Sequence, residues 1–193
     1  FFLILLGGIN GPFHNAMVTV LSKRSKKEGA YVLGAINTII GTALLLITLT
    51  IFLGAEQIIY LLAPGLNKEL HTIATTQLQV MSPIALLSGL IGLGFGSLNA
   101  RDEYLIPAIS PLATSTTLIF FTGGFWLLKN QYIPAHNINL IGGVILAVAT
   151  LGGALIQLLI QLPVLIKKEI IKLKLIWDFK HEGVQEVLKI IGP

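Results

Sequence analysis

Polar side chains that could hydrogen-bond a ligand interrupt two of the apolar segments of this chain. Asn10, His14 and Asn15 lie in the first apolar run, with Asn10 and His14 one helical turn apart. Gln157 and Gln161 lie one turn apart near the end of the last apolar run. Amide and imidazole groups are costly to expose to lipid, so these side chains should face protein or water. We therefore take them as candidate residues for lining a polar cavity.

The first of these patches also contains the pair Gly11-Pro12, which we expect to weaken the helix. Proline lacks the backbone N–H that an α-helix uses, and interrupted helices often line the binding sites of transporters. Two interpretations stay open at this point. The patch either faces a pore, or forms a kink whose polar groups are satisfied by neighbouring helices.

No arrangement of residues in the sequence is typical of an enzyme. The chain has no cysteine, so cysteine-based metal sites and disulfides are excluded. Gly92-x-Gly94-x-Gly96 resembles a nucleotide-binding loop only superficially, because it lies inside an apolar run without a preceding strand. The histidines are scattered singly, at His14, His71, His136 and His181. We predict no enzymatic activity, no metal and no cofactor.

The elements that must position the polar residues are membrane-spanning helices. Of the 193 residues, 54% are apolar and only 11% are charged, and the mean hydropathy is +0.83. A helix of roughly 20 residues crosses a hydrocarbon core of about 30 Å. The sequence predicts an all-α polytopic bundle that forms a single transmembrane domain. The predicted spans are residues 1–22, 31–54, 72–99, 106–128 and 140–166.

Two further segments are amphipathic, and the chain as a whole has the features of a fragment. Glu56–Leu62 predicts a short helix at the outer surface. Residues 167–191 predict a cytoplasmic amphipathic segment, in which charged and apolar residues alternate over Glu182–Ile191.

The sequence opens inside an apolar run and closes at the start of what reads as another helix. We expect an interior part of a longer membrane protein.

The basic residues predict the orientation of the chain in the membrane. Of the 13 basic residues, ten fall in one set of alternate connections and two in the other set, and the last, Lys189, lies within Glu182–Ile191. Basic loops stay in the cytoplasm, so residue 1 should lie outside and the chain after Ile166 inside. The first cytoplasmic loop holds four of these residues: Lys23, Arg24, Lys26 and Lys27. We interpret them as a solvated surface, and the net charge of +4 does not indicate nucleic-acid binding.

Small residues recur on one face of the third predicted span. Ala85, Gly89, Gly92 and Gly96 share that face, which predicts close packing against another helix. Similar stripes occur in two other spans: Gly34, Asn37, Gly41 and Thr48 in the second, and Gly143, Ala147, Thr150, Ala154, Gln157 and Gln161 in the fifth. Such stripes form either helix–helix contacts or the walls of a hydrated cavity.

Four stretches of the sequence resemble the MurJ (MviN) family, the lipid II flippases of bacterial peptidoglycan synthesis. They are Gly11-Pro12-Phe13 continuing to Leu21, Leu62-Ala63-Pro64-Gly65, Met81 through Pro111, and Gln161 through Pro193. The order and spacing of these stretches agree over essentially the whole chain. The resemblance implies that the chain corresponds to spans two to six of fourteen, and the family's second span also begins outside.

The resemblance further implies a function and a substrate. A flippase of this family, within the multidrug/oligosaccharidyl-lipid/polysaccharide exporter superfamily, would move undecaprenyl-diphosphate-linked lipid II across the bacterial inner membrane by alternating access. Its partners would be the lipid bilayer and lipid II, with no nucleic acid. The alternatives are another exporter of the superfamily, for polysaccharide-linked lipids or drugs, and a non-transporting membrane scaffold for cell-wall synthesis.

The chain departs from the family pattern at one functional position. The family carries a pair of arginines on its second span that are thought to hold the lipid pyrophosphate. Aligned without gaps from Phe13, these positions are Leu5 and Leu6, and a small gap would place Gly7 and Gly8 there. The second-span charge is therefore absent from this chain.

Overall fold

The computed structural model describes residues 2–132, 134, 137–171 and 174–191, and every regular element in these ranges is an α-helix or a single helical turn. The predicted all-helical membrane bundle is confirmed. The helices are α1 (Phe2–Leu21), α2 (Lys26–Leu53), α3 (Ala55–Leu62), α4 (Lys68–Met81), α5 (Ile84–Asn99), α6 (Leu105–Ile109), α7 (Pro111–Tyr132), α8 (Ile138–Lys167) and α9 (Glu182–Ile191).

Four helical stretches in the described part of the chain are long and apolar enough to cross a membrane. They are Lys26–Leu53, Lys68–Asn99, Leu105–Lys129 and Ile138–Lys167. Helix α1 has 20 residues and covers the first predicted span, and its assignment as a further membrane crossing stays a prediction. Within the predicted amphipathic segment 167–191, α8 stops at Lys167 and α9 covers Glu182–Ile191, and the described residues between them, 168–171 and 174–181, are not helical.

Proline positions explain where two of these stretches are interrupted. Pro83 separates α4 from α5, and Pro111 is the first residue of α7, where its missing N–H costs no helical bond. The expected weakening of the first helix at Gly11-Pro12 is not seen as a break. Helix α1 runs continuously from Phe2 to Leu21 with Pro12 inside it, because the loss of one backbone bond does not outweigh the packing of this helix against α5.

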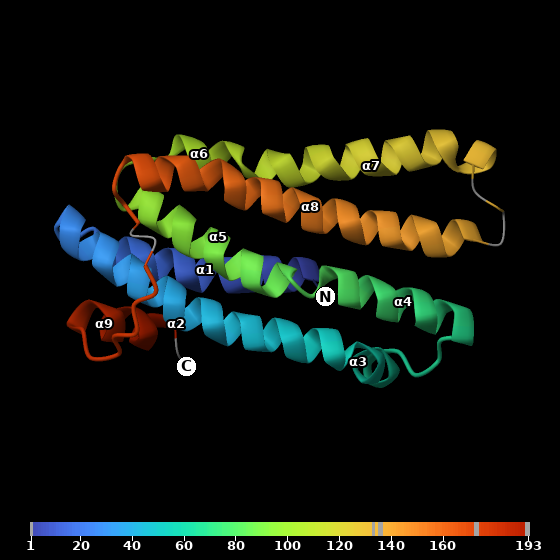
Figure 1. The fold of residues 1–193 in the computed structure, drawn as a ribbon, viewed down its shortest axis with the longest axis horizontal. Helices are drawn as coiled ribbons and strands as arrows, with labels where there is room; N and C mark the ends of the chain where they lie inside the picture. Colours follow the sequence, from blue (N-terminus) through green and yellow to red (C-terminus); the bar gives the residue numbers. More distant parts are fainter. Residues whose placement is uncertain (1, 133, 135–136, 172–173, 192–193) are drawn as a thin grey trace.

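Helix α5 is the centre of the bundle. It packs against α1, α2 and α8, whereas α7 makes its main contacts with α8. Figure 1 shows α7 and α8 as an antiparallel pair on one side and α2 on the opposite side, with α1 and α5 between them. The main core lies where α1, α2 and α5 meet, and its fully buried members include Met17, Val20, Leu33, Ile36, Leu93 and Leu98.

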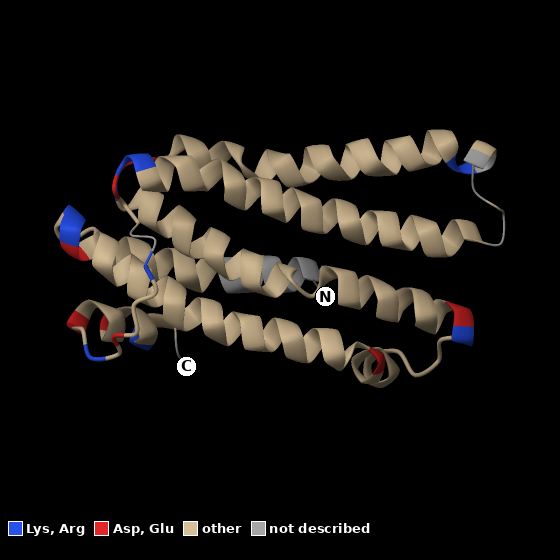
Figure 2. Ribbon diagram, viewed as in Figure 1, with Lys and Arg blue, Asp and Glu red and all other residues tan. Residues whose placement is uncertain are grey.

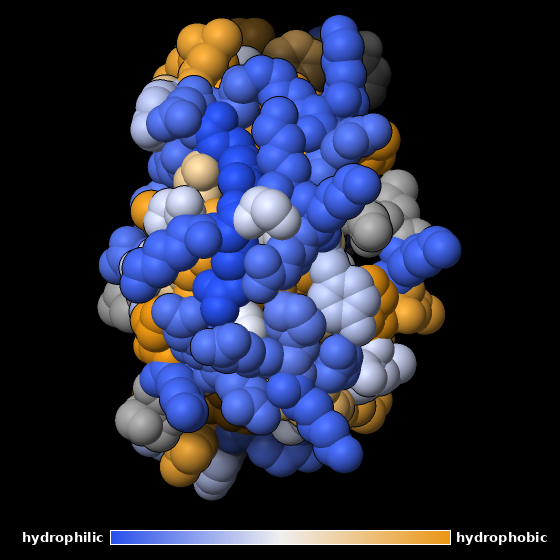
Figure 3. Space-filling model, turned by 90° about the vertical axis from the view of Figure 1, so that its left-hand side faces the viewer, coloured by the Kyte–Doolittle hydropathy of each residue, from blue (hydrophilic) through white to orange (hydrophobic). Residues whose placement is uncertain are grey.

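The connections between helices gather at the two ends of the bundle. The α1–α2 loop, the α5–α6 corner, the end of α8 and α9 lie at one end, and the α3–α4 connection, the end of α7 and the start of α8 lie at the other (Figure 1). Among the described residues, the charged side chains lie toward these ends, and the helical stretches between them are uncharged (Figure 2). The end that carries α9 presents a largely hydrophilic surface (Figure 3). We call it the basic end, because the loop with Lys23, Arg24, Lys26 and Lys27 lies there.

Candidate functional site

The exposed faces of α1 and α7 differ in chemistry. On α1 the exposed side chains include Asn15 and Thr19, which lie one turn apart on a single face, and the exposed Ser22 follows directly after the helix. On α7 most of the exposed side chains are large and apolar, and Phe120 and Leu127 are 76% and 70% exposed, although Ser115 and Thr116 near its start are exposed too. An apolar helix face is stable in lipid, but a polar one must meet water or another part of the protein. The α1 face is therefore the candidate wall of a hydrated path.

His14 lies at the edge of this face and is hydrogen-bonded on both ring nitrogens. The Asn99 side-chain amide donates to His14 Nε2 over 2.8 Å, which ties α1 to the end of α5. Because an amide nitrogen can only donate, Nε2 is the acceptor and Nδ1 carries the proton. Nδ1 then donates to Asn15 Oδ1 at 3.2 Å. The structure thus brings His14, Asn15 and Asn99 together, and the Asn99 oxygen is buried without a partner among the described residues.

Gln157 lies in a different place, between α7 and α8. Its Oε1 accepts a hydrogen bond from Thr114 Oγ1 at 3.2 Å. The two helices are very close here, since a Cβ added to Gly153 would lie 2.6 Å from the Cα of Thr114. Gln157 therefore stabilises a helix–helix contact.

Gln161 lies between α8 and α5 and is completely buried. Its amide nitrogen donates to the Gln157 carbonyl oxygen at 3.2 Å, while its Oε1 has no partner in the described structure. The amide rests on Gly94 of α5, and a Cβ at that glycine would collide with it. A buried amide oxygen without a hydrogen-bond partner lowers the stability of the fold. Gln161 is therefore a position where a polar side chain costs free energy.

The five candidate residues from the sequence thus do not form one cluster. His14 and Asn15 lie at the α1–α5 contact, Gln157 at the α7–α8 contact and Gln161 at the α5–α8 contact. The side chain of Asn10 lies outside the described residues. Asn99, Asn37 and Gly94 were not among the candidates; the only sequence signal for Asn37 is the stripe that it shares with Gly34 and Gly41.

The small residues of α5 lie against α1 and α2. A Cβ added to Gly96 would be 2.5 Å from the His14 carbonyl oxygen and 2.7 Å from Met17 Cβ, so the backbones of α1 and α5 are in direct contact. Gly89 lies against Leu44 of α2 and Phe13 of α1. Ala85 and Gly92 are buried on the same helix. Close backbone approach of this kind is how helices associate in a membrane.

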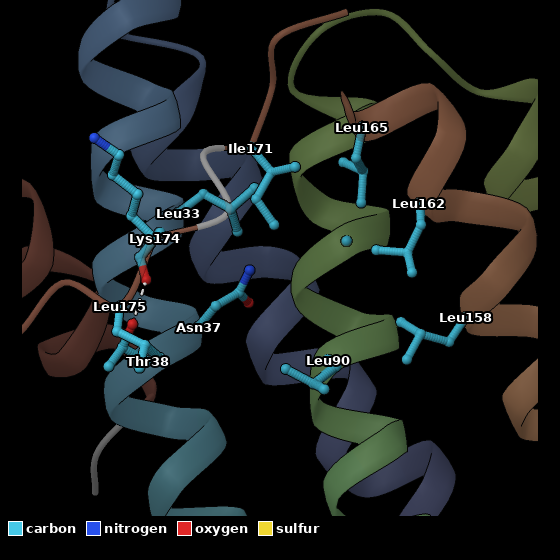
Figure 4. A pocket seen from close by; sticks show the side chains of 12 residues that line it. Leu33, Asn37, Thr38, Leu90, Leu158, Leu162, Leu165, Ile171, Lys174 and Leu175 are labelled. Atoms are coloured by element: carbon cyan, nitrogen blue, oxygen red, sulfur yellow. Dashed lines mark hydrogen bonds between the residues drawn. The ribbon is translucent and has the colours of Figure 1, made fainter. Parts of the chain in front are cut away.

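A groove of about 430 Å³ runs between α2 and α8, with α5 as its floor (Figure 4). Ile171, Lys174 and Leu175, which follow α8 in the sequence, line another side of it, and we call these residues and the adjoining residues 176–178 the roof. The lining residues are Leu33, Gly34, Asn37, Thr38, Leu90, Gly94, Leu158, Leu162, Leu165, Ile171, Lys174 and Leu175. Most of them are apolar, and the Oδ1 atom of Asn37 is buried without a partner among the described residues.

The roof is held on α2 by two hydrogen bonds. The Ile176 backbone N–H donates to Thr38 Oγ1 at 3.0 Å, and the Tyr31 hydroxyl donates to Asp178 Oδ2 at 2.9 Å. The bond from Tyr31 is the main reason that the pKa of Asp178 is lowered, and backbone N–H groups of Lys180 and His181 add to this shift. The carboxylate form of Asp178 is thus the one that fastens the roof.

The basic loop is only partly a solvated surface. Lys26 and Lys27 are exposed, and Lys23 is exposed and lies 4.0 Å from Glu186. Arg24 differs, because only 10% of its side chain is exposed and its Nη2 lies 2.8 Å from Glu186 of α9. Arg24 therefore fastens α9 to the end of α1, where it also donates to the Val20 carbonyl oxygen.

Arg101 and Lys168 make further connections at the basic end. Arg101 donates to the carbonyl oxygens of Arg24 and Ser25 at 3.1 and 3.0 Å, and so fixes the α5–α6 corner on the α1–α2 loop. Lys168 forms an ion pair with Glu103. The three connections at this end are thereby linked to one another.

Comparison with known proteins gives consistent matches over the chain. A family model described as "Lipid II flippase MurJ" matches residues 1–193. A "Probable lipid II flippase MurJ" of Synechocystis sp. is 47% identical over 194 residues, which cover 100% of this chain and 36% of that relative. A protein of the same description from Buchnera aphidicola is 32% identical, over 95% of this chain and 35% of the relative. A "Lipid II flippase MurJ" of Burkholderia cenocepacia is 25% identical, with the same coverage.

Proposed function

Because the chain belongs to the lipid II flippase MurJ family, we propose that it forms part of a transporter that moves lipid II across the bacterial plasma membrane. The observation that carries the proposal is the match of the family model to every residue of the chain. The chain spans 36% of the length of its Synechocystis relative, so the complete transport cycle belongs to a longer protein. We place this part in the N-terminal lobe of that protein.

The mechanism that we propose is alternating access, with the exposed face of α1 as one wall of the path. A diphosphate–sugar headgroup cannot be desolvated in lipid, so it requires a polar, hydrated route. Asn15 and Thr19 are exposed on this face, and His14 is held at its edge by Asn99. We assign Asn10, His14 and Asn15 to the path, while the contacts of Gln157 and Gln161 favour a packing role for these two residues.

We further propose that the basic end lies in the cytoplasm and that the chain enters α1 from outside. The support is the charge distribution, since the α1–α2 loop, the α5–α6 corner and the end of α8 share this end of the bundle (Figure 2). Lys68, the first residue of α4, and Lys129, in the last turn of α7, belong to the opposite end.

The test is rescue of a bacterial strain depleted of its own lipid II flippase by the full-length gene. We expect the wild-type gene to restore growth and cell shape, and His14→Leu or Asn15→Leu to reduce rescue while membrane levels stay equal. Gln57→Leu is the matched control, because it also replaces an exposed side-chain amide by leucine, but on α3. Failure of a well-expressed wild-type protein to rescue would overturn the proposed function, and full rescue by both α1 variants would overturn the assignment of the path.

A further inference from the structure

The helices on either side of the groove also carry exposed apolar side chains. On α2 these include Leu46 and Leu49, and on α8 they include Leu155 and Leu159. Exposed apolar side chains of a membrane-spanning helix are stable in the acyl region of a bilayer. On α8 the exposed Leu159 is the sequence neighbour of Leu158, which lines the groove, so a lipid chain on this face has a short route into the groove.

The lining of the groove fits one apolar chain with a polar group at one point. Its volume of about 430 Å³ lies within the usual range for ligand sites, which are mostly apolar with a few placed polar groups. Leu90, Leu158 and Leu162 form the apolar walls, and Figure 4 shows their side chains directed into the space between α5 and α8 or α2. A hydrocarbon chain is the matching ligand chemistry for such walls.

Asn37 supplies the polar point. Its Oδ1 is buried and unpaired among the described residues, and the side chain projects from α2 toward α5 (Figure 4). An amide oxygen in this state accepts a hydrogen bond from any donor that enters, with a gain in free energy. A hydroxyl group on a ligand would supply that donor. An acyl chain has no hydrogen-bond donor and could not.

Lys174 gives the groove a positive charge at its mouth. It lies in the roof, and its ammonium group points away from the apolar walls (Figure 4). Lys174 belongs to the chain that follows α8, and α8 ends at Lys167 at the basic end of the bundle (Figure 1). This charge is complementary to a phosphate group at the membrane surface.

We propose that the groove binds one anionic membrane phospholipid. One acyl chain lies along Leu158 and Leu162, a headgroup hydroxyl donates to Asn37 Oδ1, and Lys174 pairs with the phosphate. The lipid is a resident of the leaflet at the basic end, and its binding does not depend on which cargo the full-length protein transports. The test has two competing outcomes. The groove is occupied by another helix of the longer chain, or by the polyprenyl tail of the cargo.

The first arm of the test asks whether a lipid chain enters the groove. The full-length protein is placed in nanodiscs of phosphatidylcholine and phosphatidylglycerol that contain phosphatidylglycerol with a photoreactive acyl tail, and labelled peptides are identified by mass spectrometry. We expect label on the peptides that contain Leu90 and Leu162. Leu162→Trp fills the groove and should reduce this label about fivefold or more. Leu159→Trp, one turn away on the exposed face of α8, should leave it unchanged.

The second arm asks whether the headgroup is recognised. Lys174→Gln should reduce labelling by the phosphatidylglycerol probe about fivefold and leave labelling by a photoreactive phosphatidylcholine unchanged. Lys180→Gln is the control, because Lys180 is also exposed near this end but does not line the groove. Equal loss in the two lysine variants would show general surface attraction and would overturn the headgroup site.

Three further results would overturn the proposal. They are absence of label from the groove of a folded wild-type protein, equal label in Leu162→Trp and Leu159→Trp, and preferential displacement of the probe by a polyprenyl phosphate over phosphatidylglycerol. If Leu162→Trp does not fold, the smaller pair Leu162→Phe and Leu159→Phe makes the same comparison. The label reports binding, whereas growth rescue reports transport, so failure of one proposal is distinguishable from failure of the other.

Discussion

The two sides of α5 show how one membrane helix can form a permanent contact and an adaptable one. On the α1 side, Gly96 allows backbone to touch backbone, and no space is left. On the side that faces α2 and α8, the groove remains, and the amide oxygens of Asn37 and Gln161 are buried without partners in the described structure. Glycine spacing alone therefore does not show whether a helix face is closed.

Physical reasons make the α1 side the more rigid one. Helices in lipid associate through packing, since lipid tails are as apolar as leucine side chains. The direct backbone contact at Gly96 maximises this packing. On the groove side, Gly94 instead makes room for the Gln161 side chain. Moving this side chain breaks no hydrogen bond to its Oε1 atom, because that atom has no partner in the described structure.

Breaking the closed side should have the largest effect. In Gly96→Ala, the new methyl group would lie 2.5 Å from the His14 carbonyl oxygen, so the two backbones must separate. We expect a loss of about 1–3 kcal/mol in the free energy of unfolding of the full-length protein, the usual cost of overpacking. Gly123→Ala is the control, since a Cβ at Gly123 in α7 meets nothing within 4 Å. Equal denaturation curves in detergent for the two variants would contradict a closed contact.

On the groove side, replacing the unpaired amide of Gln161 should raise the free energy of unfolding rather than lower it. Gln161→Leu removes a buried acceptor without a partner, and we expect stabilisation by about 1 kcal/mol. Gln157→Leu should instead destabilise by about 0.6 kcal/mol, because it removes the hydrogen bond from Thr114. The same denaturation measurement compares them. If Gln161→Leu destabilises more than Gln157→Leu does, the amide of Gln161 has a partner in the full-length protein, and the contrast between the two sides of α5 weakens.

The general architecture followed from the sequence because it depends on local properties. Hydropathy predicted the all-helical bundle, which the structure confirms, and uncharged length indicated where the long apolar helices occur. Periodicity placed Gly89 and Gly96 on one face, and the structure shows what that face meets. Proline effects were less certain, since Pro83 separates two helices and Pro12 does not.

The candidate site depends on contacts between residues that are far apart in the sequence. The spacing of residues along one helix does not predict such contacts. Gln157 and Gln161 share a helix face in the sequence, but they meet Thr114 and Gly94, on two different helices. The partner of His14 is Asn99, and nothing local to either residue indicates this pair. The groove exists because α2 and α8 both lean on α5, which is a property of the packed bundle.

The smallest effect should appear at the roof of the groove and should depend on pH. The pKa of Asp178 lies below its ordinary value of 3.8, because its carboxylate accepts a hydrogen bond from Tyr31. Because folding lowers the pKa of Asp178, the Tyr31–Asp178 hydrogen bond contributes its full stabilisation at pH values above the ordinary pKa of 3.8. This stabilisation is lost as the pH falls through the lowered pKa of the folded protein. We expect backbone hydrogen exchange around Ile176 to accelerate over that range, after correction for the intrinsic pH dependence of exchange.

Tyr31→Phe sharpens this measurement, because it removes the donor and keeps the ring. The variant should exchange faster around Ile176 already at neutral pH, and its extra dependence on acid should shrink. Exchange around Met17, at the closed α1–α5 contact, should change in neither protein. If acid loosened both regions equally, the roof would not be the separately adjustable part of the bundle, and the contrast between the two sides of α5 would be lost.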